Sequence, residues 1–250
     1  MDWLRRLLYR FYWKAEKAIV PGLTSSQYCY YDKLRSLVPG KVWLDLGCGH
    51  QVFADWMTKE QSEVIASSAR VYGIDLDWAG LRAHPGISNK VFGDLSSLPF
   101  KADSMDVVSA NMVAEHLAAP ETILGEIYRV LKPNGAFIFH TPNYCGWAIR
   151  LGSRIPDSLK RKLIWFFERR REEDIFHTHY RMNTESTIRQ LAKQSDFIVE
   201  DLTMVSTSAL TAMLGPVVVG ELLYIRYLQH PSRANSRSNL VAILRKQARC

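Results

Sequence analysis

A glycine-containing turn follows an apolar segment of strand length. The segment 41–46 reads KVWLDL, and Gly47, Cys48 and Gly49 come directly after it. Glycine lets a backbone turn tightly and approach a ligand closely. Asp45 stands just before the turn, where its carboxylate would repel a pyrophosphate and attract a ligand with a cationic amino group. Alone, such a turn is weak evidence, so its meaning depends on what the neighbouring strands supply.

Three further polar residues follow the next apolar segments. Asp75 has the spacing from the glycine turn that suits two hydrogen bonds to a ribose diol. Asp94 could accept a hydrogen bond from an adenine amino group, and Asn111 follows the segment after it. Any one of these acids would more often be a helix cap or a turn former. Because parallel strands end at one edge of a sheet, we expect these residues and Asp45 to share one ligand-binding crevice.

Apolar segments of strand length alternate with stretches of helical spacing. We expect strands over residues 41–46, 70–74, 87–92, 105–110, 136–140, 196–205 and 238–245. We expect helices over residues 52–59, 120–131 and 184–193, the last with Thr184 as its N-cap. Strands that alternate with helices indicate βαβ units and a parallel sheet that helices cover on both faces.

Five segments of this region form a series with a known counterpart. They are WLDLGCG (43–49), YGIDLD (72–77), FGDLSSLPF (92–100), MDVVSANMVAEHL (105–117) and EIYRVLKPNGAFIFHTPN (126–143). The series resembles the class I S-adenosylmethionine-dependent methyltransferases, most closely the small-molecule, type 11-like branch that includes quinone-biosynthesis enzymes. The resemblance covers about residues 40–143, and FHTHYRMNT (176–184) resembles a later segment of some bacterial members. It implies an α/β fold with a doubly wound, seven-stranded, mostly parallel sheet, the last strand antiparallel, and helices on both faces.

The resemblance also implies a binding site for S-adenosylmethionine. The glycine turn would hold the methionine part, Asp75 the ribose and Asp94 the adenine, while Asn111 would lie under the sulfonium. The full set of implied cofactor-binding residues is Asp45, Gly47, Cys48, Gly49, Asp75, Leu76, Asp94, Leu95 and Asn111. One position departs from the pattern, because Gln51 stands where a third glycine is often found. We expect this change to alter the shape of the loop modestly and to leave binding intact.

Methyl transfer from a sulfonium is an in-line displacement, in which the cofactor supplies the reactive group and the protein supplies binding and orientation. An oxygen acceptor would also need a base for its proton, and histidine suits that role near neutral pH. His116, after the fourth strand, and His140, at the end of the fifth, are the main candidates, with His177 and His179 as further ones. A helix-start role for His116 and a structural role for His140 are the alternatives.

Residues 144–183 are aromatic and basic and lack a regular pattern, so we expect an insertion there. It contains a cluster of polar side chains, namely His177, His179, Tyr180 and Arg181. We expect the cluster to cover the acceptor, and Tyr180 and Arg181 to orient an anionic or carboxylated group. Surface packing of the insertion on the sheet is the alternative. We expect no metal, because no acidic residue or cysteine stands at ligand spacing from the two histidines.

Composition limits the class of protein. The 250 residues carry 32 Lys and Arg against 25 Asp and Glu, a net charge of +7, and 47% are hydrophobic, which is ordinary for a soluble globular protein. The four cysteines are scattered without a CxxC or a Cys/His spacing, so we expect reduced thiols in a cytosol. The basic excess gathers in residues 1–20, 150–172 and 226–250. Basic flanks fit an anionic surface such as a membrane, and solvated surface charge is the alternative.

Residues 1–22 have the pattern of an amphipathic helix that a Pro-Gly pair ends. Basic residues interrupt every apolar run, so we expect no secretory signal. Residues 1–20 could lie in an anionic membrane interface, or pack on the protein's own core or on a partner. The uncharged stretch 202–220 reaches the length of a spanning helix, but its Ser and Thr residues and a Gly-Pro break favour a strand end, a loop and an apolar helix.

These patterns predict an N-terminal helix over 1–22 and one methyltransferase domain over 23–250. Its two insertions would lie at about 144–183 and 206–237, the second apolar and a candidate for facing a membrane. The expected activity is methyl transfer from S-adenosylmethionine to a small-molecule acceptor, with lipid-, isoprenoid- or glycan-linked compounds favoured. A non-catalytic cofactor-binding or scaffold protein of the same fold is the alternative.

Two other classes of protein fit the sequence less well. A dinucleotide fingerprint would place glycine where the chain has Val52, which together with Asp45 disfavours a nucleotide-dependent oxidoreductase. Nucleic acid is not an expected acceptor, because the chain has no Asn-Pro-Pro-aromatic run and no RNA-binding stretch. We expect a cytoplasmic protein, with the inner face of a membrane as a place of peripheral attachment.

Overall fold

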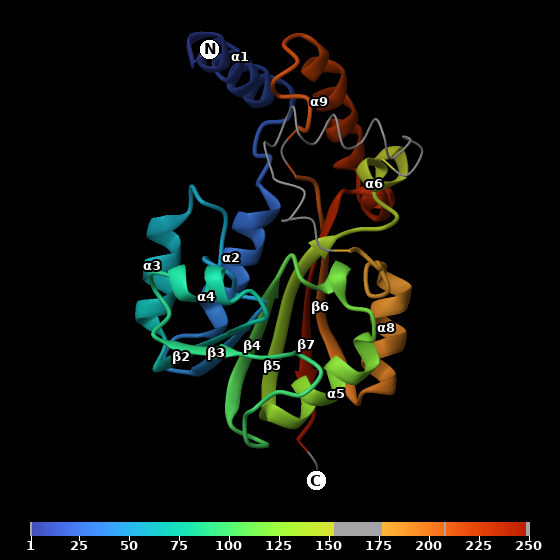
Figure 1. Cartoon of the computed structure of the whole chain (residues 1–250). Coiled ribbons are helices and arrows are strands. Elements are labelled where there is room, and N and C mark those ends of the chain that lie inside the picture. Colours follow the sequence, from blue (N-terminus) through green and yellow to red (C-terminus); the bar gives the residue numbers. More distant parts are fainter. Residues whose placement is uncertain (1, 153–176, 208, 249–250) are drawn as a thin grey trace.

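Seven strands form one sheet in the computed structural model, which describes residues 2–152, 177–207 and 209–248 (Figure 1). The strands are β1 (Val42–Leu46), β2 (Arg70–Asp75), β3 (Asn89–Phe92), β4 (Met105–Asn111), β5 (Leu131–Pro142), β6 (Phe197–Val205) and β7 (Asn239–Lys246). Their order in the sheet is β3-β2-β1-β4-β5-β7-β6. The strands β1 to β5 pair in parallel, whereas β7 runs antiparallel to both β5 and β6. The expected mostly parallel sheet with its last strand antiparallel is confirmed.

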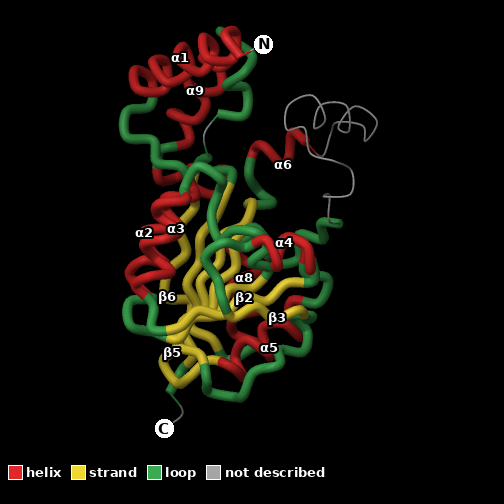
Figure 2. Tube along the Cα trace, turned by 60° about the vertical axis from the view of Figure 1, so that its left-hand side comes forward, coloured by secondary structure: helices red, strands yellow, loops and turns green. Residues whose placement is uncertain are grey.

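Helices cover both faces of this sheet (Figures 1 and 2). One face carries α2 (Ser26–Leu37), α3 (Thr58–Ser67) and α4 (Trp78–Ala83), and the other carries α5 (Pro120–Val130) and α8 (Glu185–Gln194). The remaining described helices are α1 (Asp2–Ile19), η1 (Ala114–His116), α6 (Trp147–Gly152), α9 (Val217–Leu228) and η3 (Pro231–Ser236). Residues 153–176 of the expected insertion over 144–183 lie outside the described residues.

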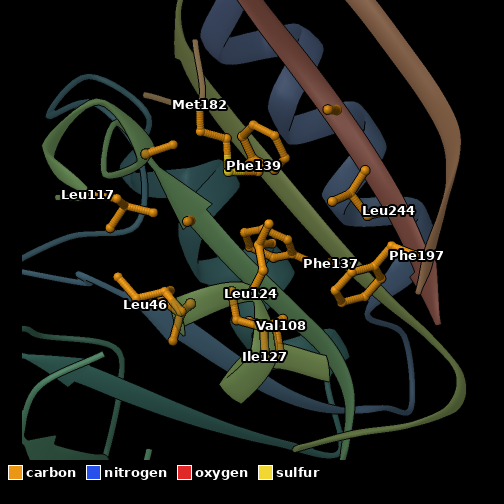
Figure 3. Close-up of a cluster of buried hydrophobic side chains, with 14 of the residues drawn as sticks. Leu46, Val108, Leu117, Leu124, Ile127, Phe137, Phe139, Met182, Phe197 and Leu244 are labelled. Carbon is orange, nitrogen blue, oxygen red and sulfur yellow. The ribbon is translucent and has the colours of Figure 1, made fainter. Parts of the chain in front are cut away.

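Each face of the sheet has its own hydrophobic core. Figure 3 shows the core on the α5–α8 side, where Phe137 and Phe139 of β5 lie among side chains of β4, α5 and β7. Ile188 and Leu191 of α8 belong to the same core. On the opposite face, Trp43 of β1 is fully buried beneath α2 and α3. Because helices cover both faces, the central strands are buried on both sides, which explains why their sequences read as nearly unbroken apolar runs.

Local hydrogen bonds define where several helices begin. The Thr184 hydroxyl accepts a bond from the Thr187 amide (3.2 Å), and the Thr187 hydroxyl accepts one from the Thr184 amide (3.2 Å). This reciprocal capping box confirms Thr184 as the N-cap of α8. Ser25 caps α2 in a similar way, since its hydroxyl accepts a bond from the Gln27 amide (3.3 Å).

The helix expected over residues 52–59 is wrong. A loop follows the glycine turn, and α3 begins only at Thr58. Val52 and Phe53 are buried in this loop, and the Val52 amide donates to Oε1 of Gln61 (2.7 Å). The apolar side chains of this irregular loop have the spacing of a helix, and for that reason the sequence pattern predicts a helix that does not form. No helix N-terminus therefore follows the glycine turn directly, and the turn must meet its ligand with loop amides.

The helices α1 and α9 pack on each other beyond the edge of the sheet at which β5 ends (Figures 1 and 2). Their interface is a small hydrophobic core of Tyr12, Val20, Ala209, Val218, Leu222 and Ile225. The strand end, loop and apolar helix expected over 202–220 are confirmed, since β6 ends at Val205 and α9 begins at Val217. Within the described residues, no helix is long and apolar enough to cross a membrane.

Candidate cofactor and acceptor site

The glycine turn crosses from β1 towards the segment that follows β4. The amides of Gly47 and Cys48 donate to the Ile74 carbonyl oxygen of β2 (2.8 and 3.3 Å). Gly47 has a φ of +60°, and a Cβ there would lie 2.6 Å from Cγ2 of Val113. Gly49 also has a positive φ (+47°), but a Cβ there would meet only a carboxylate oxygen of Asp75 at 4.0 Å. Gly47 is therefore required by packing, whereas Gly49 leaves open space beside the backbone.

Asp75 ties the glycine turn to the end of β2. Its Oδ2 accepts a hydrogen bond from the Gly49 amide (2.7 Å), and its Oδ1 accepts one from the Asp77 amide (2.7 Å). A carboxylate has about four acceptor sites, so about two remain for a ligand. The half-buried Asp75 is thus held in place by its own protein and still able to accept two hydrogen bonds from a diol.

Asp45 lies beneath the turn rather than on its surface. It is 2% exposed, and its Oδ1 accepts a hydrogen bond from the Ser109 hydroxyl, which in turn accepts one from Nε1 of Trp43 (2.7 Å). Burial raises the pKa of Asp45 to about 7, although the Ser109 bond opposes the rise. Cys48 is also buried, and its burial raises the pKa of the thiol. A nearby cation would favour the ionised form of Asp45, so this carboxyl is poised to lose a proton when a cationic ligand binds.

Asn111 joins three elements around the loop that follows the glycine turn. Its Nδ2 donates to the Val52 carbonyl oxygen (2.8 Å) and to Oε1 of Gln27 on α2 (3.0 Å). The Val52 carbonyl can only accept, which fixes the orientation of the Asn111 amide. Oδ1 of Asn111 therefore accepts from Nδ1 of His140 (2.8 Å). The predicted position under the sulfonium thus holds a side chain that the protein immobilises.

His140 is the partner that holds Asn111 from β5. It is 1% exposed, and its ring stacks on that of Tyr30 with centroids 5.8 Å apart. Burial lowers the pKa of His140 to about 4, so the ring is neutral at pH 7 and carries its proton on Nδ1. Among the described residues, Nε2 of His140 has no hydrogen-bond partner.

Asp94 and Leu95 follow β3 in an exposed turn. The amide and the hydroxyl of Ser96 donate to the two oxygens of Asp94 (2.9 and 2.8 Å), and these bonds lower the pKa of that carboxyl. Leu95 is half-buried, whereas Leu76, after β2, is 60% exposed. The ends of β2 and β3 therefore present apolar surface next to two carboxylates. Sequence reasoning missed two exposed aromatic residues there, Trp78 and Phe92, whose rings meet edge to face at 6.2 Å.

The later histidine segment is attached to the end of β4 by backbone hydrogen bonds. The Glu115 carbonyl oxygen accepts from the amides of His179 (2.7 Å) and Tyr180 (3.1 Å). The His177 carbonyl oxygen lies 3.0 Å from Nδ1 of His116. Because a carbonyl oxygen only accepts, Nδ1 of His116 carries a proton in this contact. The structure thus brings the predicted residue His116 together with the predicted acceptor segment.

Side chains attach the same segment to β5. Nδ2 of Asn183 donates to Oγ1 of Thr141 (2.7 Å) and to the Pro142 carbonyl oxygen (2.9 Å), and the Thr141 hydroxyl donates to Oε2 of Glu115 (2.8 Å). Burial raises the pKa of Glu115. The neighbouring Met182 is fully buried in the core of Figure 3. Sequence reasoning missed Glu115, Thr141 and Asn183, because only the folded chain brings them into contact.

The side chains of the predicted acceptor cluster point in part to solvent. His177, His179 and Arg181 are exposed, and Tyr180 is half-buried with its ring 5.4 Å from that of Tyr144. The rings of His177 and His179 lie 4.6 Å apart. Within the described residues, no group of three or more His, Cys, Asp or Glu side chains could hold a metal ion.

A model of the methyltransferase domain family matches residues 27–202, which include the glycine turn, Asp75, Asn111 and the His177–Asn183 segment. The chain belongs to this family. This member of the methyltransferase family is 35% identical over 135 residues to a Mycolicibacterium smegmatis protein named "probable S-adenosylmethionine-dependent methyltransferase", covering 50% of this chain and 49% of that one. The chain therefore spans about half the length of that relative.

Other similarities broaden this comparison. The methyltransferase is 29% identical over 143 residues to a ubiquinone biosynthesis O-methyltransferase of Hahella chejuensis, with 53% of this chain and 56% of that one covered. It is 36% identical over 105 residues to a phthiotriol/phenolphthiotriol dimycocerosates methyltransferase of Mycobacterium tuberculosis, with 39% and 36% covered. A crystal structure of an S-adenosylmethionine-dependent methyltransferase from Mesorhizobium loti shares its fold, with a TM-score of 0.57, 20% identity, and 89% of this chain and 98% of that one covered.

The residues of the site fit S-adenosylmethionine, the cofactor of the family. Open space at Gly49 lets a ligand approach the backbone, and Asp75 keeps two acceptor sites for a ribose diol. Exposed apolar surface at Leu76 suits a flat base. The buried carboxyl of Asp45 suits the cationic amino group of the methionine part. Gln51, in the place of a third glycine, donates a hydrogen bond to the carboxylate of Asp55.

Proposed function

We propose that this methyltransferase transfers a methyl group to a small-molecule acceptor at the edge where β1, β4 and β5 end. The contact between Gly47 and Val113 carries the proposal, because it packs the glycine turn against the segment that leads to His116. The glycine turn of the proposed cofactor site and the segment that carries the candidate base therefore pack against each other. When bound, S-adenosylmethionine supplies an electrophilic methyl group on a sulfonium.

In the proposed cofactor site, each predicted residue has a distinct role. Asp75 binds the ribose diol, and Leu76 and Leu95 contact the adenine beside Asp94. The glycine turn, with Cys48 packed beneath it, holds the methionine part, and Asp45 balances its amino group. Asn111 keeps the following loop in place through the Val52 carbonyl, and His140 keeps Asn111 in place. His140 is therefore a positioning residue in this proposal.

His116 is the proposed base for an acceptor hydroxyl. Bound S-adenosylmethionine would supply the methyl group for an in-line displacement by the acceptor oxygen, and Nε2 of His116 would take the proton of the acceptor hydroxyl. Glu115 supports this role, since its Oε1 lies 3.9 Å from that nitrogen and would stabilise the imidazolium formed. General-base catalysis of this kind contributes about 10²–10⁴-fold to the rate.

The proposed acceptor is a lipid-, isoprenoid- or glycan-linked hydroxyl compound. Two relatives bear names that refer to ubiquinone biosynthesis and to phthiotriol dimycocerosates, both lipophilic. His177, His179 and Tyr180 supply rings in the segment whose backbone contacts His116, and Arg181 supplies a cation that can orient an anionic group. The proposal places the enzyme in the cytoplasm, attached peripherally to the inner face of a membrane.

Transfer of a labelled methyl group tests the proposal directly. The purified chain would be incubated with methyl-labelled S-adenosylmethionine and a panel of hydroxylated quinone precursors, isoprenoid alcohols and glycolipids. We expect label to enter at least one organic-soluble compound, and His116→Gln to lower that transfer. A chain that binds S-adenosylhomocysteine, yet transfers label only to water-soluble acceptors, would contradict the lipid-linked acceptor and leave the methyltransferase assignment standing.

A further inference from the structure

The helix α1 has two apolar faces, and the residues that the structure describes cover only one of them. Leu8, Tyr12, Ala15 and Ile19 face α9 and are buried or half-buried. The second face, here called the outer strip, consists of Trp3, Leu4, Leu7 and Phe11, which are 75%, 52%, 49% and 40% exposed. A soluble surface seldom gathers large apolar side chains in this way without a use for them.

The inner face is held firmly, so the fold does not need the outer strip. The Tyr12 hydroxyl donates to the Glu16 carboxylate and accepts from the Ala209 amide (3.4 Å). Glu221 of α9 in turn accepts bonds from the amides of Leu210 (2.8 Å) and Thr211 (2.7 Å). These contacts attach α1 and the 209–211 loop to α9 without any residue of the outer strip.

The loop that leads into α9 adds exposed apolar residues next to α1. Gly215 packs against Leu8, whose Cδ2 would lie 3.6 Å from a Cβ at that glycine. The neighbouring Leu214 is 43% exposed, and Leu210 and Val217 are each 60% exposed. The outer strip is therefore bordered by a second set of apolar side chains that also lack cover.

The charge of α1 indicates what could cover the outer strip. The helix carries five basic residues, Arg5, Arg6, Arg10, Lys14 and Lys17, all of them exposed. Its two acids are Asp2 and Glu16, and Glu16 is buried against Tyr12. Within the described chain, none of the five cations forms a salt bridge. The solvent side of α1 thus combines aromatic and leucine side chains with cations that no carboxylate of the described residues pairs with.

We infer that α1 and the adjoining 210–217 loop dock on an anionic lipid bilayer, with the outer strip in the headgroup region. Helices with Trp, Phe and Leu on one face and Lys and Arg beside it lie in the membrane interface, and anionic lipid attracts the cations. A second copy of this chain fits less well, because it would bring the same five cations against each other. Figures 1 and 2 place α1 beyond the edge at which β5 ends, which is the edge of the proposed acceptor site. The inference extends the proposed lipid-linked acceptor, but it does not depend on turnover.

Vesicle sedimentation of the full chain tests this inference. The vesicles would contain phosphatidylcholine alone, or phosphatidylcholine mixed with phosphatidylglycerol, at low and high salt. We expect binding to the anionic vesicles, and a reduction of about tenfold or more when the salt is raised or when Arg6→Gln, Arg10→Gln, Lys14→Gln and Lys17→Gln are combined. A matched variant with Lys59→Gln, Arg70→Gln, Lys101→Gln and Lys193→Gln removes four exposed cations elsewhere and should bind as the parent does.

The outer strip has its own variant, Leu4→Ser with Leu7→Ser and Phe11→Ser. We expect it to lose vesicle binding and to keep its melting temperature and its affinity for S-adenosylhomocysteine. Equal binding to neutral and anionic vesicles, or unchanged binding of the strip variant, would overturn the inference. So would a dimer in solution that the strip variant abolishes while the parent binds no vesicles. Failure of methyl transfer with vesicle binding intact would instead count against the proposed function alone.

Discussion

The amide of Gly49 donates a 2.7 Å hydrogen bond to Oδ2 of Asp75, which joins the turn after β1 to the end of β2. The bond orients a carboxylate that would otherwise rotate, and the second oxygen is held by the Asp77 amide. A ligand that takes the remaining acceptor sites of Asp75 therefore meets the glycine turn at the same time. We therefore expect the binding of the ribose and the binding of the methionine part to be coupled through this one side chain.

Substitution of two glycines should have opposite effects on stability. Gly47→Ala forces a side chain into a positive φ and places its Cβ 2.6 Å from Val113, so we expect the free energy of unfolding to fall by about 1–3 kcal/mol. Gly125→Ala adds a methyl group in open space on α5 and should raise that free energy by about 0.5–1 kcal/mol. Urea denaturation of both variants measures the difference. Equal stability of the two would contradict the packing described for the glycine turn.

Binding of a cationic ligand should release a proton from Asp45. Its pKa of about 7 is raised by burial, so near pH 6 the carboxyl is mostly protonated until the amino group of S-adenosylhomocysteine favours the charged form. We expect release of up to about one proton near pH 6 and almost none at pH 9, where the carboxylate is already ionised. Calorimetry in buffers of different ionisation enthalpy counts the protons. The Asp45→Asn variant should bind S-adenosylhomocysteine more weakly and release no proton. If proton release in that variant equalled that of the parent, the proton would come from another group.

Asn183 should be needed for turnover and not for cofactor binding. Asn183→Ala removes the bonds to Thr141 and Pro142 and leaves buried partners unsatisfied, which costs about 1–3 kcal/mol. We expect a lower kcat/KM for the acceptor and little change in affinity for S-adenosylhomocysteine. Gln190→Ala, on the exposed side of α8, serves as the control. Equal loss of cofactor affinity and of acceptor turnover in Asn183→Ala would contradict a role of the His177–Asn183 segment in acceptor binding alone.

His116→Gln should lower kcat with an oxygen acceptor by about 10²–10⁴-fold, because the hydroxyl proton would lose its base. Single-turnover methyl transfer separates this chemical step from binding, and the affinity for S-adenosylhomocysteine should stay near that of the parent. Glu121→Gln, exposed at the start of α5, is a matched surface change. A purely structural role for His116 would appear as a lower melting temperature with kcat unchanged.

The sequence predicted the strands better than the helices, and the reason is physical. Central strands buried on both faces read as apolar runs, so the predicted bounds of β1 and β4 are within one residue of the observed ones. The strand β5 begins at Leu131, five residues before the predicted start at 136, because residues 132–135 read as a turn. The loop after the glycine turn has the apolar pattern of a helix, because Val52 and Phe53 are buried although their backbone is irregular. The short α4, and α2 with its mixture of aromatic and polar residues, gave no periodic pattern that stood out.

Some residues of the candidate site could be predicted from the sequence, and others could not. Asp75 and Asn111 could be predicted because they are the last residues of β2 and β4. The carboxyl ends of parallel strands meet at one edge of the sheet. The contacts of Thr141 with Glu115 and with Asn183 join residues 26 and 42 positions apart, which no local pattern records. Burial of Asp45 and His140, and the pKa changes that follow from it, also depend on the packed structure.

Titration of the purified chain with S-adenosylhomocysteine by calorimetry tests the central claim most directly. We expect micromolar binding, about −8 kcal/mol, by the parent. Asp75→Ala should weaken it by about a hundredfold or more, since it removes two bonds to a charged acceptor, each of which contributes about 1.5–3 kcal/mol. Asp32→Ala, an exposed carboxyl on α2, should change nothing. A folded parent that binds no S-adenosylhomocysteine, or an Asp75→Ala variant that binds as tightly as the parent, would contradict the cofactor site described for this methyltransferase.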